Sequence, residues 1–161
     1  MRLISDLKFI VDQNVGKLAK WLRTMGYDTL FFNSGDDARM IATALTEGRV
    51  ILTRDTQIMK RRVVTSGRLK AILILSDKPE LQVRQVIDSL SLDCQFKPFT
   101  ICLECNHPLV ERSKEQVEDL VPPYVFRTQN QFMECPACHR IYWQGTHWQA
   151  MTRRLKKFVK S

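Results

Sequence analysis

Several features that would assign this chain to a special class are missing from its sequence. No apolar run approaches the roughly 20 residues that a helix needs to cross a bilayer, so we expect no transmembrane segment. Residues 1–6 do not lead into the long apolar core of a signal peptide, and no glycine-rich phosphate loop is present. These absences leave the cytoplasm as the expected location.

Acidic residues are scarce relative to basic ones. The chain of 161 residues contains 17 Asp and Glu against 25 Lys and Arg, which gives a formal charge of +8. An excess of this sign makes nucleic acid a plausible partner. The hydrophobic share of 44% and the charged share of 26% are those of an ordinary globular protein, and the length fits one domain with or without a small appendage.

Cysteine is present in an odd number, five, which argues against a disulfide scaffold in a chain without a secretory signal. Four of the five form two Cys-x-x-Cys pairs: Cys102, Cys105, Cys135 and Cys138. This doubled spacing predicts a tetrahedral Zn²⁺ site in a zinc ribbon. The alternative, two unrelated redox motifs, would require a thioredoxin-like context around one pair. Four thiolates leave no open coordination position, so the zinc is expected to be structural.

The residues around the cysteine pairs refine this prediction. His107 and His139 lie beside the pairs, but four cysteines suffice, so neither histidine is included in the site. Cys94 is expected to be a small buried hydrophobic residue. A ribbon of this size is expected to lack a core of its own and to take its folding free energy from the metal.

Apolar stretches with the lengths of strands alternate with helical stripes in the first part of the chain. The four expected strands cover residues 8–12, 29–32, 50–52 and 71–75. Gly26 and Gly48 follow the first two helical stripes, where a left-handed residue ends a helix. The alternation predicts an α/β fold with a parallel sheet and flanking helices over residues 1–97. Residues 98–161 are expected to form the zinc ribbon and a basic C-terminal helix.

Two of the predicted strands lead into an aspartate. Asp12 ends the first strand and Asp55 follows the third, and the carboxyl ends of parallel strands meet at one edge of a sheet. Asp37 opens the second helix at the same edge, and it is expected to lean toward the sheet while its neighbour Asp36 caps the helix. Asp77 leaves the fourth strand and is either a fourth acid of this site or a helix cap.

Acids that converge without basic partners are costly unless a cation neutralises them. Mg²⁺ or Mn²⁺ with oxygen ligands would do so, and such a site can activate water for phosphodiester cleavage. An aspartate at the end of a strand can also be no more than the cap of the next helix, and this alternative stays open. Asn14, two residues after Asp12, either caps or orients a metal-bound water.

Two basic stretches are candidates for phosphate contacts. Residues 60–62 read Lys-Arg-Arg, for which a solvated helix face is an equal alternative. The final helix, from Thr146, is free of acids and contains Trp148, which favours phosphate contact and base stacking. The C-terminal helix is therefore the better candidate for binding nucleic acid.

In their order along the chain, these motifs resemble a known family. They are Phe9-Ile10-Val11-Asp12-x-Asn14, Leu22-Arg23-x-x-Gly26-Tyr27-Asp28, Asp36-Asp37, Val50-Ile51-Leu52-Thr53-Arg54-Asp55, a first Cys-x-x-Cys pair, and Cys135-Pro136-x-Cys138-x-Arg140-x-Tyr142-Trp143-x-Gly145-x-His147-Trp148. The pattern is similar to the Mut-seven C-terminal RNase family, in which a PIN-like nuclease domain precedes a zinc ribbon. The resemblance covers nearly the whole chain.

The resemblance implies a PIN-like, Rossmann-like fold and a divalent-metal-dependent ribonuclease that acts on single-stranded RNA. Its acidic set would be Asp12, Asp37 and Asp55. PIN-like nucleases often have a fourth acid, for which Asp77 is the candidate here. Two other functions stay open: a non-catalytic RNA- or ribosome-binding module whose acids cap helices, and the toxin of a toxin–antitoxin pair, which would need a protein partner.

Overall fold

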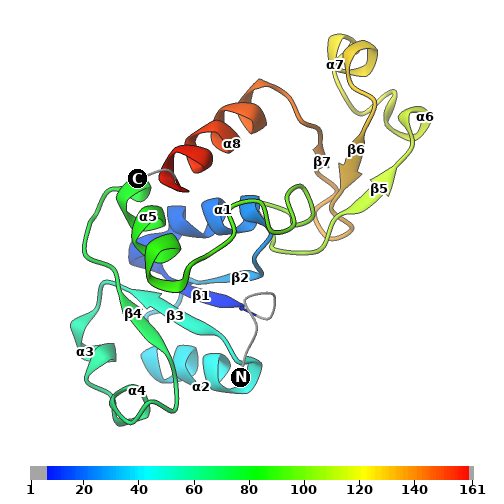
Figure 1. The fold of residues 1–161 in the computed structure, drawn as a ribbon. Helices are drawn as coiled ribbons and strands as arrows, with labels where there is room; N and C mark the ends of the chain where they lie inside the picture. The colour runs from blue at the N-terminus through cyan, green and yellow to red at the C-terminus, as the bar shows by residue number, and fades with distance from the viewer. Residues whose placement is uncertain (1–6, 160–161) are drawn as a thin grey trace.

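The computed structural model describes residues 7–159 of the chain (Figure 1). Residues 1–6, where no signal peptide is expected, and Lys160 of the basic tail lie outside this range. Within it, no helix combines the length and the apolar character that a membrane span requires. The described part of the chain consists of an α/β unit, a small antiparallel sheet and a long C-terminal helix.

The α/β unit is built on a four-stranded sheet. Its strands are β1 (Phe9–Asp12), β2 (Thr29–Phe32), β3 (Val50–Thr53) and β4 (Ala71–Leu73). They are all parallel and lie in the order β2-β1-β3-β4. The predicted parallel sheet is confirmed, although β4 ends at Leu73 and not at the expected Leu75. The register pairs Val11 with Leu52, so Asp12 and Thr53 come next on neighbouring strands.

Helices cover both faces of this sheet because its central strands are apolar on both sides. On one face, α1 (Gly16–Met25) and α5 (Pro79–Leu90) pack against Phe9, Val11 and Leu52. On the other, α2 (Asp37–Glu47) and α3 (Thr56–Met59) pack against Ile10 and Ile51. The two layers hold the carboxyl ends of the strands in a fixed position.

The connections between these elements follow the expected turn chemistry with one exception. Gly26 ends α1 in the left-handed region at φ 99°, and a Cβ atom there would lie 2.3 Å from the carbonyl oxygen of Lys97. The exception is the segment that includes residues 60–62, for which the sequence offered a helix face. Two one-turn helices, α3 and α4 (Arg62–Thr65), occupy this region, in which the apolar periodicity is weak.

The C-terminal unit contains a three-stranded antiparallel sheet with the order β5-β6-β7. Its elements are β5 (Val110–Arg112), α6 (Lys114–Val117), α7 (Pro123–Thr128), β6 (Phe132–Glu134) and β7 (Ile141–Tyr142). Val117, Val121 and Phe132 are buried together, with Trp143 packed against them. The expectation that this unit has no core of its own is therefore wrong, because α6 and α7 close over the sheet.

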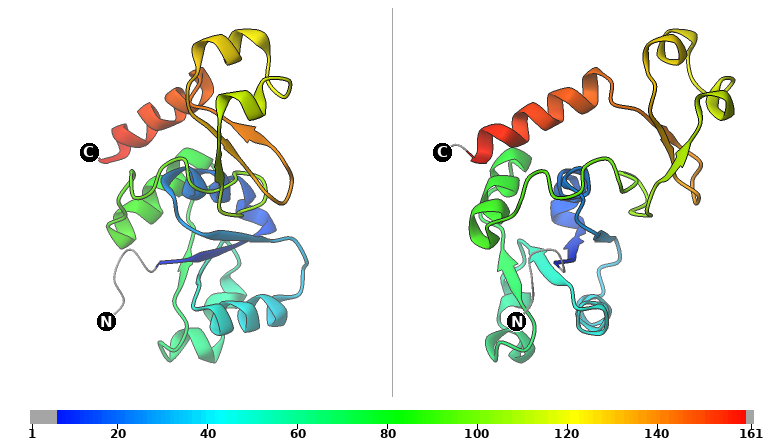
Figure 2. Two further views of the ribbon diagram at one scale, coloured as in Figure 1. Left: turned by 90° about the vertical axis from the view of Figure 1, so that its right-hand side faces the viewer. Right: turned by 45° about the vertical axis from the view of Figure 1, so that its right-hand side comes forward.

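The last helix, α8 (Thr146–Val159), returns to the first unit and lies against α1 and α5 (Figures 1 and 2). Its Leu155 belongs to the same buried cluster as α1 and α5. The rings of Phe158 and Trp21 meet edge to face at 6.3 Å. Trp148 meets Phe99 in the same way at 5.0 Å. Trp148 therefore packs within the fold, whereas the sequence favoured it for base stacking.

Candidate active site and metal centre

A small depression lies at the carboxyl edge of the sheet, where β1 and β3 end. It has a volume of about 180 Å³, and four acids line it: Asp12, Asp36, Asp37 and Asp55. Gln13, Asn14 and Phe32 complete much of its wall. The acids at the ends of β1 and β3 and at the start of α2, although distant in the sequence, thus share one surface hollow.

Thr53 connects the two strand-end aspartates. Its side chain is fully buried, and its hydroxyl donates a hydrogen bond to Oδ2 of Asp12. The same hydroxyl oxygen accepts a hydrogen bond from the backbone N–H of Asp55 at 2.9 Å. The strand alternation that points Leu52 to one side and Thr53 to the other places this hydroxyl between the two acids. Arg54, between Thr53 and Asp55 in the sequence, is exposed, and its guanidinium donates a long hydrogen bond of 3.5 Å to the carbonyl of Ile74.

The strand-end aspartates also act as caps. Oδ1 of Asp12 accepts the N–H of Asn14 at 3.0 Å and begins the short 3₁₀ helix Gln13–Val15. Oδ1 of Asp55 accepts the N–H of Gln57 at 2.8 Å and begins α3. A carboxylate has about four lone-pair sites, so the cap bond, and in Asp12 the further bond from Thr53, still leaves sites for a cation. Capping and metal binding are therefore compatible in these two residues.

The neighbours Asp36 and Asp37 divide their tasks as the sequence predicted for the cap. Asp36 is exposed and accepts the N–H of Arg39 at 3.1 Å, so it is the N-cap of α2. Asp37 occupies the first turn and is partly buried. Burial, followed by the negative charges of Asp55 and Asp12, raises the pKa of Asp37 above its ordinary value. Like charges that resist ionisation in one hollow are the setting that a divalent cation relieves.

Asp77 lies apart from these acids. It is exposed and is not among the residues that line the depression. Its alternative role as a helix cap, in a capping box with Glu80, is wrong, because the N-cap of α5 is Lys78 and no side chain caps this end of the helix. Pro79 at the first position already removes one of the N–H groups that a cap would satisfy.

The four paired cysteines converge on one point. The sulfur atoms of Cys102, Cys105, Cys135 and Cys138 all lie within 4.8 Å of one another. Four sulfurs at about 2.3 Å from a tetrahedral Zn²⁺ would be roughly 3.8 Å apart, and the sulfurs of Cys102 and Cys138 are 3.7 Å apart. Over residues 7–159 this is the one group of three or more His, Cys, Asp or Glu side chains whose ligand atoms all lie within 4.8 Å of one another. The geometry fits a structural zinc ion, whereas the carboxylates of the depression are less tightly gathered.

Local hydrogen bonds favour the thiolate form that zinc requires at one of the four cysteines, Cys102. Burial raises the pKa of the Cys102 thiol, but the hydroxyl of Tyr142, 3.1 Å from its sulfur, and nearby backbone N–H groups bring it down to about 7. The two pairs have matching backbones. Asn106 and His139 each follow a pair, each has a φ near +65°, and each donates its N–H to the carbonyl of the first cysteine.

The first cysteine pair is attached to the α/β unit at the opposite edge of the sheet from the acids. Arg23, buried on α1, donates from Nε to the carbonyl of Thr29 at 2.9 Å and from a terminal nitrogen to the carbonyl of Leu103 at 2.8 Å. The Asn106 side chain accepts the N–H of Thr29 at 2.8 Å and donates to Asp28 at 2.6 Å. Sequence reasoning assigned no such role to Arg23 or Asn106. The sequence offered one indication, the asparagine at position 106 directly after the first pair, because asparagine tolerates a left-handed backbone there.

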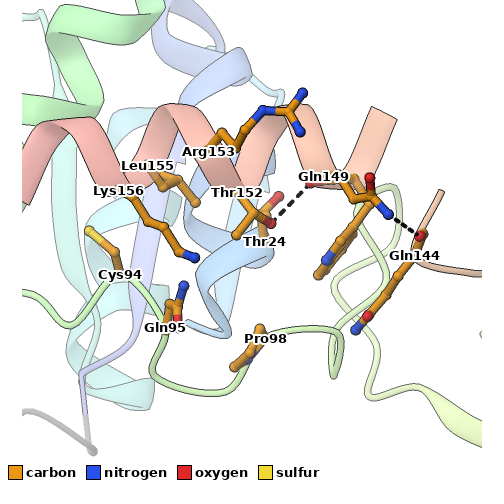
Figure 3. Close-up of a pocket in the computed structure, with 11 residues that line it drawn as sticks. Thr24, Cys94, Gln95, Pro98, Gln144, Gln149, Thr152, Arg153, Leu155 and Lys156 are labelled. Carbon is orange, nitrogen blue, oxygen red and sulfur yellow. Dashed lines mark hydrogen bonds between the residues drawn. The ribbon is translucent and has the colours of Figure 1, made fainter. Parts of the chain in front are cut away.

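Cys94 and the cavity that it borders do not belong to either centre. Cys94 is buried, as predicted, and burial raises the pKa of its thiol. It lines a cavity of about 360 Å³ between α8, the end of α1 and the loop that includes Gln95 and Pro98 (Figure 3). No carboxylate lines this cavity, so it lacks the oxygen ligands of the depression at the sheet edge.

Comparison with protein families identifies the chain over nearly its full length. The family model described as the Mut7-C RNAse domain matches residues 7–155. The comparisons with curated proteins and with solved structures found no match. The matched range includes the acids of the depression, all four paired cysteines and most of α8.

Proposed function

The chain belongs to the Mut7-C RNase domain family, and we propose that it hydrolyses phosphodiester bonds of single-stranded RNA at the depression that Asp12, Asp37 and Asp55 line. The observation that carries the proposal is the gathering of these acids, with Asp36, around one hollow of about 180 Å³. An anionic substrate approaches such a surface only when a cation offsets the acids. The proposed enzyme is therefore metal-dependent.

Asp12, Asp37 and Asp55 are the residues that would hold the ion. Carboxylate oxygens are the ligands of hard ions such as Mg²⁺ and Mn²⁺, and the raised pKa of Asp37 supports a demand for positive charge at this point. When bound, the ion would promote ionisation of water and offset charge on the phosphate. Asp77 does not line the depression, so the proposed set contains three acids and not four.

The contribution of the chain itself is orientation. Thr53 and the N–H of Asn14 hold both oxygens of Asp12, while the N–H of Gln57 holds one oxygen of Asp55. The buried strands beneath them keep the two carboxylates in place before any ligand arrives. Asn14, exposed at the rim, is placed to contact substrate or solvent in the hollow.

Cleavage of end-labelled RNA with Mg²⁺ or Mn²⁺ tests the proposal. We expect Asp12→Asn and Asp55→Asn to lower the rate by at least about 100-fold, because each removes a charged ligand worth several kcal/mol in the transition state. Asp77→Asn serves as the control and is expected to cleave like the wild type. Equal cleavage by the wild type and the first two variants would contradict the assignment.

A second candidate function has one specific observation in its favour. Asp12 and Asp55 both cap a following helix, as a non-catalytic RNA-binding module would require. In that case RNA would bind with a steep dependence on salt and without metal-dependent turnover. The variants Asp12→Asn and Asp55→Asn would then change the unfolding free energy but leave RNA affinity equal or tighter. The cleavage assay above separates the two functions directly.

A further inference from the structure

A third and larger hollow lies between α1, α8 and the part of the C-terminal unit that carries the four-cysteine cluster, which we call the cysteine-rich unit. It has a volume of about 790 Å³, and we call it the α1–α8 groove. Helix α1 contributes Gly16, Lys17 and Lys20, the cysteine-rich unit contributes Arg140 and Tyr142, and α8 contributes Arg154, among others. The groove thus exists only because α8 returns to the first unit and the cysteine pair is attached to α1.

The charge of the groove is positive. Five lysine and arginine side chains line it against one acid, Glu104. Glu104 forms an ion pair with Lys20 at 2.9 Å. Arg23 is buried and donates hydrogen bonds to two carbonyl groups. The remaining cations, Lys17, Arg140 and Arg154, are exposed. The pair of Arg154 with Glu80, at 3.5 Å and more than half exposed on both sides, is weak and open to competition by phosphate.

An exposed aromatic ring lines the groove where β2 borders it. Phe31 is 42% exposed, which is unusual for a phenylalanine in a strand. Gly16 lies beside the ring, so closely that a Cβ atom there would be 3.0 Å from it. The ring is therefore supported from one side and open on another. A supported, open ring is the platform on which an unpaired base stacks.

The groove adjoins the acid-lined depression at β2. Phe31 lines the groove, whereas the next residue, Phe32, lines the depression. In the same way Gly16 lines the groove and Asn14, two residues earlier, lines the depression. Since successive strand residues face opposite sides, β2 forms the border between the two hollows. A polymer that follows the groove past Phe31 would reach the acids over the end of β2.

We propose that the α1–α8 groove binds the single-stranded RNA substrate and leads it to the acids, with Lys17, Arg140 and Arg154 on its phosphates and Phe31 under a base. This inference rests on the proposed ribonuclease function and adds the path of the substrate. It also assigns a task to the four-cysteine site, which fixes the segment from which Arg140 and Tyr142 line the groove beside α1. A paired helix is excluded by the stacking contact, because its bases are not available to Phe31.

Binding is measured on the full chain carrying Asp55→Asn, so that RNA is not cleaved, by fluorescence anisotropy of a labelled oligouridylate without Mg²⁺ or Mn²⁺. Arg154→Gln is expected to weaken binding about tenfold and to reduce the salt slope by about 0.7, the value for one phosphate contact on a single strand. The matched control is Arg153→Gln. Arg153 is the preceding residue of α8, but it lines the cavity of Figure 3 and not the groove, so its replacement should change affinity less than about twofold.

Phe31→Ala separates stacking from charge. It is expected to weaken binding at least about fivefold with an unchanged salt slope, because it removes no charge. Circular dichroism and zinc content establish that each variant is folded, and Phe31→Leu replaces Phe31→Ala if the latter unfolds. Lys17→Gln and Arg140→Gln extend the test to the exposed cations that α1 and the cysteine-rich unit contribute to the groove, and each is expected to weaken binding.

The outcomes distinguish the groove from the ribonuclease assignment. Equal losses in Arg153→Gln and Arg154→Gln, or no effect of Phe31→Ala, would overturn the groove even if the wild type cleaves RNA. Groove-dependent binding by a wild type that never cleaves RNA would support the path and overturn the proposed function. Failure of the Asp55→Asn chain to bind RNA at low salt would overturn the groove.

Discussion

Thr53 donates a hydrogen bond from its buried hydroxyl to the carboxylate of Asp12 on the neighbouring strand. The register that pairs Val11 with Leu52 brings these residues side by side. Because the same hydroxyl also accepts the N–H of Asp55, one side chain sets the positions of both strand-end acids.

Replacement of the hydroxyl should separate shape from hydrogen bonding. We expect Thr53→Val to lower the free energy of unfolding by about 1 to 3 kcal/mol, because the N–H of Asp55 loses its acceptor, and to raise the Mn²⁺ concentration needed for RNA cleavage. Thr53→Ser, which keeps the hydroxyl, should retain the metal dependence of the wild type. Urea denaturation and a metal titration measure the two effects. Identical metal dependence in both variants would contradict the positioning role.

The stability of the metal-free protein should depend on the protonation of Asp37. The pKa of this carboxyl is raised in the folded state, so the folded state binds the proton more tightly than the unfolded chain does. Its contribution is therefore present at low pH and is lost as the pH rises from about 4 through the folded pKa. Asp37→Asn should be more stable than the wild type at pH 7, by less than about 1 kcal/mol.

The measurement for Asp37 is urea denaturation across pH 3 to 7, with the exposed Asp77→Asn as control. The advantage of Asp37→Asn should vanish toward pH 3, where both proteins carry an uncharged group at this position. Added Mg²⁺ should stabilise the wild type more than the variant. A variant that is less stable than the wild type at pH 7 would show that Asp37 serves the fold and not a charge cluster.

The cysteine cluster should hold one zinc ion per chain. Cys135→Ser is expected to abolish stoichiometric zinc and to lose the cooperative unfolding of the C-terminal unit, because structural zinc contributes folding free energy directly. Cys94→Ser is the control, since Cys94 lies in the core and not in the cluster. It should lower stability yet retain zinc, as measured by elemental analysis. Zinc loss in both variants would contradict the assignment of ligands.

The attachment of the first cysteine pair should depend on one side chain. Asn106→Gly keeps the left-handed backbone but removes the bonds to Thr29 and Asp28, so we expect a loss of about 1 to 3 kcal/mol from the unfolding free energy. His139→Gly makes the equivalent change in the second pair, where the exposed side chain loses one contact, between its Nδ1 and Oε2 of Glu134 at 3.2 Å, and no bond to the α/β unit. Both variants should bind one zinc ion. Equal losses would contradict the attachment.

Many of the features of this protein were accessible from local sequence. Alternating apolar runs predicted the parallel sheet because a strand buried on both faces must be apolar throughout, and the repeated Cys-x-x-Cys spacing predicted the four-cysteine cluster. Asp36 as a helix cap and Cys94 as a core residue also followed from near neighbours. Each of these depends on spacing along a few residues, which a sequence displays directly.

Tertiary structure decided the features that join distant segments. The bond from Thr53 to Asp12 depends on strand register, the attachment of Asn106 to Thr29 spans two units, and the packing of Trp148 on Phe99 depends on the return of α8. The α1–α8 groove, lined by three such segments, has no local signature at all. Sequence specified which chemical groups the chain contains and the elements that carry them, whereas packing decided which of those groups meet, because contacts between remote segments depend on the geometry of the whole fold.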